Sequence, residues 1–587
     1  MCGILSVIQK KNNELDARAC RRALGCLTQR GPDLCTSQIW NQRVFLGQTI
    51  LSITGDIKQS DAHLSSESGR YELLLNGEIY NYLYLNEAYL KGRMRGPDRE
   101  LTDTQVLVNL HDCLDVKGIV SVLDGMFAYV ILDKERNKLY LNRDPQGEKS
   151  LYVYEDAELV IISSELSPIL DLVPSLRPDP QILRDYFHTR HFMFIERTLY
   201  RGVRQLRPGC LEVLDLESFR WQTIEKVLLE DWIDSARMQR LRQMSLDELA
   251  DECDEILRSC IKQMVPNRKF ASVFSGGVDS SLISHYVAEH KSPDILVAVN
   301  HVGKDQISCE LEAFGKILKR DIERLDVDAF SYSREIIRCQ RICRSPLFSH
   351  SFVGQSIQSA FVRRNGCKVL FGGDGADELF GGYACYSQRL DLNGKFSPSP
   401  YSAFLSSQVE FYGDDTSLLE GELELQWKRA LEAYRHVDND WERTVQAMMF
   451  IDFAMQLPAV GLRGSDLMSS MYAIETRSPF VRRPVVEFAL NLPLKAKADS
   501  SEGCPELMRA KPLLKKLFLR YFPKELLVAK QGFSGFPNES AAYIGSVEDY
   551  LAIDFLGIDR KRTDFIQLER AAAWKIINCE YFLREAR

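Results

Sequence analysis

Hydrophobic runs of three to five residues alternate with amphipathic stretches along this chain, a pattern typical of a mixed α and β protein. The runs predict strands over residues 71–75, 270–274 and 369–371. Periodicity and capping residues predict helices over 16–28, 104–114 and 246–264, and another that begins after 278. Residues 222–244 are charged and show no strand pattern. We therefore expect a connector there, between an N-terminal and a C-terminal domain.

Length and charge limit the class of protein. A chain of 587 residues exceeds what one hydrophobic core supports, so we expect several domains or two large ones. The net charge of −8 disfavours bulk nucleic-acid binding and offers no polybasic membrane anchor. No run approaches the roughly 18 uninterrupted apolar residues of a membrane span, and the N-terminus lacks a signal-peptide pattern. We expect neither nucleic acid nor a membrane as partner.

The 15 cysteines include no C-x-x-C pair. Cys339 and Cys343 lie four residues apart, and His188 and His191 three, but neither pair has neighbours that would complete a zinc site. We interpret the cysteines as buried reduced thiols and the histidines as ordinary polar positions. A reducing, cytoplasmic compartment follows.

The chain begins Met1-Cys2-Gly3. If the methionine is removed, Cys2 carries a thiol and a free α-amine, whose pKa near ~8 suits a base that takes the thiol proton and returns it to a leaving amine. The small second residue favours that removal. Many chains begin this way without consequence, so the motif gains meaning only from the segments that follow.

Two later segments offer groups that would serve such a nucleophile. Asn76-Gly77 follows the strand 71–75, where an amide side chain and an unobstructed backbone N–H suit an oxyanion. A hairpin turn is the alternative for these two residues. Asp103 opens the helix 104–114, either as a helix cap or as a carboxylate that holds a substrate ammonium.

Together these segments resemble the N-terminal-nucleophile glutaminase domain of the class II glutamine amidotransferases, with the asparagine synthetase branch closest in appearance. The resemblance covers about the first 210 residues, with several motifs in the family's order. These are MCGI at 1–4, RGPD at 30–33, NGEIYN at 76–81, DGMFA at 124–128, RDP at 143–145 through LY at 151–152, SE at 164–165 and PG at 208–209.

The resemblance implies a four-layered αββα sandwich in which Cys2 attacks the amide of glutamine. It implies that Asn76 and Gly77 form the oxyanion hole and that Asp103 binds the glutamine α-amine. The implied glutamine-binding residues are Ile50, Leu51, Ile53, Asn76, Gly77, Glu78 and Asp103.

One position departs from the family. Ile50 stands where the family carries an arginine that grips the glutamine α-carboxylate. The missing charge-assisted bond is worth ~1.5–3 kcal/mol, a roughly 10- to 100-fold loss in glutamine binding unless Arg43 or Arg70 replaces it. The pocket would then be slow with glutamine, need a partner, or prefer another amide.

The C-terminal half opens with a candidate phosphate site. The strand 270–274 is followed by Ser275-Gly276-Gly277-Val278-Asp279-Ser280-Ser281 and an amphipathic helix. Successive backbone N–H groups at a helix N-terminus attract phosphates, and the two glycines let the backbone come close. Asp279 is best explained by a Mg²⁺ ion shared with the phosphates. A glycine-rich turn with a helix cap is the alternative.

A second loop, Gly372-Gly373-Asp374-Gly375-Ala376-Asp377-Glu378, follows the strand 369–371. It suits the other face of a metal–nucleotide site, or else a solvated acidic turn. The first loop is not a Walker A motif but resembles the pyrophosphate loop of the ATP pyrophosphatases, which adenylate a carboxylate or carbonyl oxygen. The second loop, with ETRSPF at 475–480 and KQGF at 530–533, again resembles asparagine synthetase. The resemblance thus spans nearly the whole chain, except for insertions near 391–424 and a divergent tail after 538.

This second resemblance implies further roles. Asp279 and Asp377 would hold Mg²⁺–pyrophosphate, and Lys530 would steady negative charge during adenylation. Asp374 falls where the family usually has the glutamate that takes a proton from ammonia; its reach is one methylene, ~1.5 Å, shorter. The implied ATP-binding residues are Phe274, Ser275, Gly276, Gly277, Asp279, Ser280, Ser281, Val299, Gly372 and Gly373.

Val481-Arg482-Arg483 stands where the family commonly has a Leu-Asp pair. Together with Asp374, this change concerns the acceptor half of the site. It puts the identity of the carboxylate substrate in question more than the adenylation chemistry.

We therefore predict a class II glutaminase domain over 1–210, a connector over 211–245 and an asparagine-synthetase-like domain over 246–587. The second domain should be an α/β parallel-sheet ATP-pyrophosphatase fold with helical additions. The catalytic residues would be Cys2, Asn76, Gly77, Asp374 and Lys530, the substrates ATP, glutamine and a carboxylate, and the metal Mg²⁺. The products would be an amide, AMP and pyrophosphate, with aspartate as the default acceptor.

Several alternatives stay open. A specialised acceptor, such as a sugar acid or a natural-product intermediate, fits the departures at Ile50, Asp374 and Val481. A cyclising ligase similar to the β-lactam synthetases would not need Cys2, Asn76, Gly77 and Asp103. A non-catalytic scaffold would not need the loop 275–281. A homodimer is compatible with the sequence.

Overall fold

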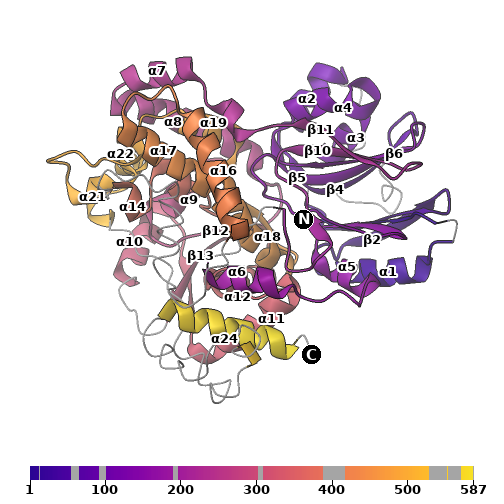
Figure 1. The fold of residues 1–587 in the computed structure, drawn as a ribbon. Helices are drawn as coiled ribbons and strands as arrows, with labels where there is room; N and C mark the ends of the chain where they lie inside the picture. Colours follow the sequence, from indigo (N-terminus) through magenta and orange to yellow (C-terminus); the bar gives the residue numbers. More distant parts are fainter. Residues whose placement is uncertain are drawn as a thin grey trace.

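The computed structural model describes residues 1–11, 14–53, 65–91, 101–188, 196–301, 308–387, 417–527, 551–552 and 570–585. Figure 1 shows two bodies side by side, an N-terminal one coloured indigo to violet and a C-terminal one coloured pink to yellow. The N-terminus lies at their junction, so the segment predicted to carry the nucleophile faces the second domain.

The N-terminal domain contains two stacked antiparallel sheets. The first has the order β2-β3-β1-β8-β7-β9 and the second β11-β10-β6-β5-β4. The strands of the first are β1 (Gly3–Gln9), β2 (Leu34–Trp40), β3 (Val44–Ile50), β7 (Tyr152–Glu155), β8 (Leu159–Ser163) and β9 (Val203–Gln205). Those of the second are β4 (Tyr71–Ile79), β5 (Gly125–Asp133), β6 (Lys138–Arg143), β10 (Cys210–Asp215) and β11 (Trp221–Lys226).

Helices cover the outer faces of both sheets (Figure 1). Helices α1 (Ala17–Gly25) and α5 (Leu166–Leu172) lie on the first sheet, and α2 (Tyr82–Tyr89), α3 (Asp103–Cys113) and α4 (Val116–Val122) on the second. Buried aliphatic side chains such as Ile4, Val130 and Ile162 fill the space between the sheets. The predicted αββα sandwich is confirmed.

The strand expected over 71–75 continues to Ile79. Asn76 pairs with Ala128 and Gly77 with Phe127 across β5, so the Asn-Gly step lies within a strand and forms no hairpin. Gly77 has φ +133°, and a Cβ there would lie 1.9 Å from the carbonyl oxygen of Met126. Only glycine tolerates this approach, which explains why the step looks like a turn in sequence.

Residues 222–244, which we expected to be a connector without a strand, are structured. They complete the edge strand β11 and then form η2 (Leu229–Trp232) and α7 (Ser235–Gln243). An edge strand is half solvated and carries charged side chains, so it lacks the alternation of a buried strand. The second sheet thus continues to Lys226, past the expected boundary at residue 210.

The C-terminal domain is built on a five-stranded sheet with the order β14-β13-β12-β15-β16, and all its pairs are parallel. Its strands are β12 (Phe270–Val273), β13 (Ile295–His301), β14 (Ile322–Val327), β15 (Val369–Phe371) and β16 (Glu475–Arg477). The strands predicted over 270–274 and 369–371 and the helix α8 (Leu246–Met264) are confirmed. So is the parallel α/β architecture.

Many helices surround this sheet. Those from α6 to α14 are α6 (Pro180–His188), α9 (Val278–His290), α10 (Ser308–Leu318), α11 (Ala329–Cys343), α12 (Ser351–Arg364), α13 (Ala376–Phe380) and α14 (Ala384–Ser387). The later ones are α16 (Ser417–Ala433), α17 (Asp440–Ile451), α18 (Arg463–Ser470), α19 (Arg483–Leu490), α20 (Leu494–Lys497), α21 (Glu506–Arg509), α22 (Pro512–Tyr521) and α24 (Arg570–Glu585). Short turns η5 (Pro479–Val481) and η6 (Lys524–Leu526) join them.

Helix α17, a π-helix η4 (Asp452–Leu462) and α18 follow one another without interruption. By length and composition the stretch Asp440–Ser470 could cross a membrane, and it is the one such helix in the described part of the chain. Its most apolar window is 83% buried inside the molecule, as in the core helix of a domain. The expectation of no uninterrupted apolar run does not conflict with this, because polar residues divide the stretch.

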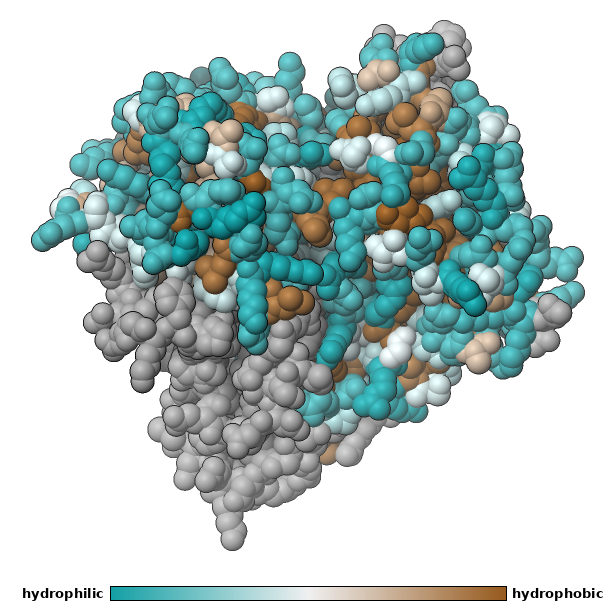
Figure 2. Space-filling model, turned by 45° about the horizontal axis from the view of Figure 1, so that its top comes forward, coloured by the Kyte–Doolittle hydropathy of each residue, from teal (hydrophilic) through white to brown (hydrophobic). Residues whose placement is uncertain are grey.

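The two domains share one hydrophobic core. A contiguous cluster runs from Leu24 and Ile169 in the first domain to Phe352 and Leu467 in the second. Figure 2 shows a largely hydrophilic face on which hydrophobic residues gather mainly along the hollow between two lobes. Cys339 and Cys343 are buried free thiols in this core, as expected.

Candidate functional site

The first candidate site lies where the chain enters β1. The backbone N–H of Cys2 donates to Asn76 Oδ1 at 3.1 Å. The thiol faces the backbone N–H of Leu51 and the side chain of Gln48. Desolvation raises the pKa of the Cys2 thiol, since a thiolate there loses contact with water. The nucleophile therefore needs a base beside it, and an α-amine on Cys2 would be such a base.

Asn76 presents an unused donor beside this thiol. Its side chain is fully buried, and within the described part of the chain its Nδ2 has no hydrogen-bond partner. A buried amide without a partner costs free energy unless a ligand takes the bond. The placement suits a developing oxyanion, the role predicted for Asn76 and its neighbour Gly77.

Asp103 is not the cap of its helix. Thr102 caps α3 through a capping box with Gln105, which leaves the Asp103 carboxylate for other partners. Its Oδ2 accepts from the backbone N–H of Ile79 at 2.9 Å, beside the Asn76–Glu78 segment. Burial raises the pKa of Asp103, so a substrate ammonium would find a desolvated carboxylate to pair with.

Ile50, Leu51 and Ile53 are all buried at the end of β3. Arg43 lies at the other end of that strand and donates to the carbonyls of Gln9 and Lys10. Arg70 precedes β4 and pairs with Asp133. Arg43 precedes the first residue of β3 while Ile50 is its last, and Arg70 lies just before β4, well before Asn76, so roughly 20 Å of extended strand separates each arginine from the site. Neither arginine therefore takes the place of the family's arginine at Ile50.

Cations from the second domain reach the loop after β3 instead. Lys368 Nζ donates to Asp33 Oδ2 at 2.7 Å and to the Ser52 carbonyl at 3.0 Å. Arg268 Nε donates to the Ile53 carbonyl at 3.0 Å. Arg268 and Lys368 precede β12 and β15, the strands that carry the two candidate nucleotide loops at their other ends. The sheet of the second domain thus holds the candidate glutamine loop directly.

Glu78 is also held from the second domain. Arg477 of β16 pairs with it and with Glu475, the latter at 2.9 Å. Arg482 pairs with Asp124 and lies over the ring of Tyr80. Arg482, expected on the acceptor side, therefore points into the domain interface, while the neighbouring Val481 contacts the loop at Gly375.

The second candidate site begins at the loop after β12. Gly276 has φ +76° and Gly277 caps α9, so the backbone turns sharply as it enters the helix. Ser275 and Ser280 hydrogen-bond to each other at 3.0 Å, and Ser281 Oγ is buried without a partner in the described part of the chain. This geometry matches the predicted anion nest at a helix N-terminus.

The two predicted nucleotide loops meet. A Cβ on Gly373 would lie 3.3 Å from Asp279 Cβ, and one on Gly382 would overlap Asp377 Oδ1. Phe274 directly follows β12 and Val299 lies on the neighbouring β13, and the Phe274 N–H donates to the Val297 carbonyl. Gly372 lies beside Gly373 at the end of β15.

Lys511 lies between the two predicted metal-binding acids. Its Nζ is 2.6 Å from Asp279 Oδ2 and 2.5 Å from Asp377 Oδ1, and the side chain is almost fully buried. Burial alone would lower the pKa of Lys511, but the two carboxylates outweigh it and raise the pKa. Lys511 also has φ +53°, a strained conformation that often occurs at functional sites.

Asp374 is held by two hydroxyl groups. Ser465 Oγ donates to its Oδ2 at 2.8 Å and Ser478 Oγ to the same atom at 3.4 Å. Burial raises the pKa of Asp374. Glu378, one turn along, accepts from Tyr383 at 2.6 Å, and burial with repulsion from Asp377 raises its pKa to about 8. Lys530 lies outside the described residues, so its predicted role stays a prediction.

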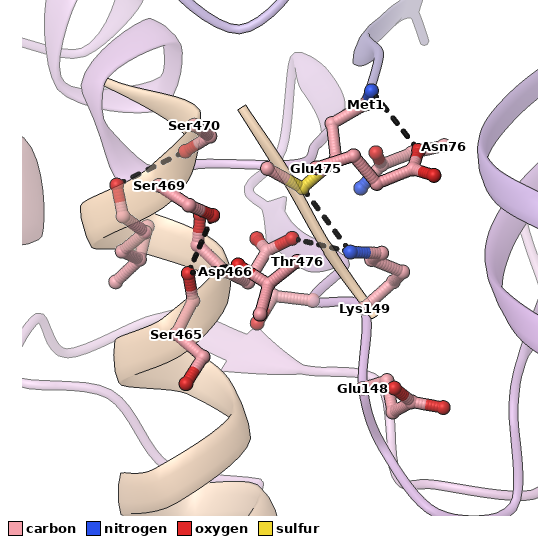
Figure 3. A network of polar contacts seen from close by, with 12 residues as sticks. Met1, Asn76, Glu148, Lys149, Ser465, Asp466, Ser469, Ser470, Glu475 and Thr476 are labelled. Carbon is pink, nitrogen blue, oxygen red and sulfur yellow. Dashed lines mark hydrogen bonds and ion pairs between the residues drawn. The ribbon is translucent and has the colours of Figure 1, made fainter. Parts of the chain in front are cut away.

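A buried ionic network joins the two sites (Figure 3). Arg30 donates to the Cys2 carbonyl at 3.1 Å and pairs with Glu165 at 2.9 Å and Asp466 at 2.8 Å. Lys149 pairs with the other oxygen of Asp466 at 2.9 Å. Asp466 follows Ser465 in α18, so the network passes from the nucleophile to the residue that holds Asp374.

Acid should weaken this interface. Burial opposes ionisation of Asp466, but Arg30 and Lys149 outweigh it and hold its pKa at about 2, below the ordinary 3.8. A carboxylate with a lowered pKa contributes stability that is complete above the unfolded value and is lost as pH falls through the folded value. We expect Asp466 to account for a loss of about 2 kcal/mol between pH 4 and pH 2.

Denaturant unfolding at pH 5 and pH 2.5 measures this loss in the free energy of unfolding, with Asp466→Asn as the comparison. The variant should be less stable than the parent at pH 5 and should lose less free energy of unfolding on acidification. Equal losses in both proteins would show that Asp466 does not carry the effect.

Some residues of these sites carry no signal in the sequence. Lys511 precedes Pro512 at the start of a helix and belongs to no recognised motif. Arg268 and Lys368 look like surface charges that flank strands. The positive φ of Lys511 and the contacts of Arg268 and Lys368 with the loop after β3 are visible only in the folded structure.

Comparisons with known proteins match both halves. A family model described as glutamine amidotransferase domain matches residues 1–223, and one described as asparagine synthase matches residues 252–569. Asparagine synthetase (glutamine-hydrolysing) 3 of Bacillus subtilis is 22% identical over 637 aligned residues, covering 98% of this chain and 95% of that protein. Asparagine synthetase 1 of the same species is 27% identical over 405 residues, covering 67% and 60%.

Likeness to solved structures is low. The structure titled as the allosteric regulatory enzyme of purine biosynthesis aligns with a TM-score of 0.29 at 12% identity, over 56% of this chain and 80% of that one.

Proposed function

Because the chain belongs to the asparagine synthase family, we propose that it is an ATP-dependent, glutamine-hydrolysing ligase that turns a carboxylate into an amide. One observation carries this proposal. A desolvated cysteine beside an unused buried amide donor is joined, through a buried ionic network, to two nucleotide-type loops whose acids converge. A scaffold would have no use for either site.

In the first site, the Cys2 thiolate would attack the carbonyl carbon of the glutamine side-chain amide. The carbon–sulfur bond forms, and the Asn76 Nδ2 and Gly77 N–H donate to the oxyanion. The carbon–nitrogen bond then breaks. The α-amine of Cys2 passes the proton that it took from the thiol to the leaving nitrogen, which departs as ammonia. Water hydrolyses the thioester to glutamate. Asp103 would hold the α-ammonium of the substrate throughout.

In the second site, a carboxylate oxygen would attack the α-phosphorus of ATP and release pyrophosphate. Asp279 and Asp377 fit a magnesium ion, since both carboxylates converge on one cation, Lys511. The described residues hold no group of three or more acidic, His or Cys ligands. Phosphate oxygens and water would therefore complete the shell. Magnesium would neutralise charge on the leaving pyrophosphate.

The acceptor is the finer part of the proposal. Aspartate is the default, as the family name indicates. A specialised carboxylate is the second candidate, because Asp374 is shorter than the family's glutamate and is held back by Ser465 and Ser478. Because the Asp374 side chain is shorter than glutamate, the nitrogen and the acyl carbon have to meet at a different position.

The proposal is tested by measuring glutamate and pyrophosphate release together, with glutamine, Mg-ATP and a panel of carboxylates that includes aspartate. We expect pyrophosphate release to depend on one acid in the panel and glutamate to appear in step with it. Asparagine formation from aspartate would identify an asparagine synthetase. Pyrophosphate with another acid would identify a specialised acceptor, and none with any acid would contradict the ligase.

A further inference from the structure

Glu148 is a buried residue at the domain interface, and its carboxylate has no partner among the described residues. It lies between β6 and β7, on the loop that also carries Lys149, and the residue is 7% exposed. In the described part of the chain its carboxylate makes no hydrogen bond or ion pair, and Figure 3 shows it without a dashed line beside Lys149. An ionised carboxylate in such a place costs several kcal/mol unless a cation joins it.

The charged groups that face Glu148 do not satisfy it. Lys149 pairs with Asp466, and Arg482 pairs with Asp124. Asp144 accepts the backbone N–H groups of Glu148 and Lys149, and Asp374 lies near enough to repel Glu148. Burial, then repulsion from Asp144, raises the pKa of Glu148 well above its ordinary value. The described residues around Glu148 therefore offer no unpaired cation, and the site favours one that arrives from outside.

Glu148 also lies near the loop 372–378, which carries Asp374. A Cβ on Gly147 would lie 2.9 Å from Pro458 Cβ, and one on Gly375 would lie 3.5 Å from Leu457 Cδ2. The loops of Glu148 and Asp374 thus pack against adjacent residues of η4. A π-helical segment is rare and marks functional sites more often than chance allows. Glu148 belongs to the glutaminase domain but lies beside the synthetase site.

We propose that Glu148 binds an ammonium group at the interface of the two domains. This rests on the proposed function. Two sources share that chemistry: ammonia released from glutamine, which becomes ammonium by taking the proton that thioester hydrolysis releases, and the amino group of an amino-acid acceptor.

For ammonium in transit the proton balance is simple. The Glu148 carboxylate takes one proton from ammonium and leaves neutral ammonia, whose lone pair attacks the acyl carbon. The carbon–nitrogen bond forms as the bond from that carbon to the AMP oxygen breaks, and the surplus N–H proton passes to Asp374. A carboxyl with a raised pKa suits this exchange near neutral pH. Such a role also compensates for the short reach of Asp374.

The binding step is tested without turnover. Thermal unfolding of the full chain is compared in ammonium chloride and in potassium chloride at equal ionic strength, for the parent and for Glu148→Gln. We expect ammonium to raise the Tm of the parent above its value in potassium, because a ligand of the folded state stabilises it. The difference should vanish in Glu148→Gln. No difference in the parent, or an equal one in the variant, would overturn the proposal.

Kinetics then assign the source. With ammonium chloride as nitrogen donor, Glu148→Gln should raise KM for ammonium at least ~10-fold if the site holds ammonium in transit. If the site holds the acceptor's amino group, KM for the acceptor in pyrophosphate release should rise instead. Unchanged KM values for both ammonium and the acceptor would overturn the proposal. Inactivity of the parent with every acid would refute the proposed function and leave the thermal test standing.

Glu72→Gln is the matched control, because Glu72 is a buried carboxylate of the same domain that pairs with Lys134 at 2.6 Å. It should lower Tm and leave both KM values unchanged. Glu148→Gln should keep or raise Tm in potassium chloride, since it removes an unpaired buried charge. Glutamine hydrolysis in both variants should stay near that of the parent, which reports that the domain is folded.

Discussion

Replacement of Lys511 by methionine should lower pyrophosphate release at least ~100-fold with either glutamine or ammonium as nitrogen donor. Lys511 is the one cation that contacts both predicted metal-binding acids in the described part of the chain. Its loss leaves Asp279 and Asp377 to repel each other and removes a positive charge where the triphosphate would lie. Initial rates of pyrophosphate release at saturating Mg-ATP measure the effect. Glutamine hydrolysis should change less than about twofold.

Lys515→Met is the matched control for this prediction. Lys515 lies one turn further along α22 and donates to the Leu507 carbonyl rather than to an acid. Burial, with repulsion from Lys511, lowers the pKa of Lys515 to about 8, so it is the weaker cation of the pair. If both variants lose pyrophosphate release equally, the effect belongs to the helix and not to Lys511.

Lys511→Arg separates charge from geometry. A guanidinium keeps the charge, but its planar fork replaces a compact ammonium in a fully packed position. A Cβ on Gly382 would already lie 2.4 Å from Lys511 Cε, so there is little room for a larger group. We expect Lys511→Arg to recover only part of the activity, and full recovery would mean that net charge alone matters.

Local sequence was sufficient for the elements whose chemistry is contiguous. The loop 275–281 combines strand, glycines and helix N-terminus in one segment, so its strand–loop–helix geometry could be predicted from neighbours in the chain. The same holds for the strand 369–371 and for α8, whose cap and periodicity lie within the helix itself. The two stacked sheets followed from the family resemblance and not from periodicity.

The features that could not be predicted from the sequence depend on contacts between distant segments. Lys511 lies 232 residues from Asp279 in sequence, so nothing near either residue signals their pairing. Gly77 ended the predicted strand because glycine is typical of turns, whereas here it permits a close approach to Met126. Arg43 and Arg70 were plausible replacements for a cation at Ile50 until strand direction placed them at the wrong ends. Strand direction and domain contacts are properties of the fold, which a single sequence does not display.

Cys2→Ala should abolish glutamine-dependent amide formation, at least ~10³-fold, and should leave the ammonium-dependent reaction within about twofold of the parent. The Cys2 thiol is the group that forms the thioester in the proposed reaction, whereas the second site has its own residues. Glutamate release and pyrophosphate release, each measured with glutamine and with ammonium chloride, separate the activities of the two sites. Cys35→Ala, which removes an exposed thiol from β2, is the control and should match the parent.

The same prediction extends to the initiator methionine. In the structure Met1 is almost fully buried, its ammonium lies 3.2 Å from Glu475 Oε2, and its sulfur lies 3.1 Å from Lys149 Nζ. A chain that keeps Met1 has an amide nitrogen on Cys2 and so lacks the base that the thiol requires. Preparations whose intact mass shows Met1 retained should therefore differ in activity from those whose intact mass shows Met1 removed. Those that retain Met1 should behave like Cys2→Ala, and glutamine hydrolysis by a retained-Met1 preparation would contradict the α-amine as base. Loss of Met1 also empties the space beside Lys149, which lies next to Glu148 in sequence. Processing would then create the nucleophile and open the interface in a single event.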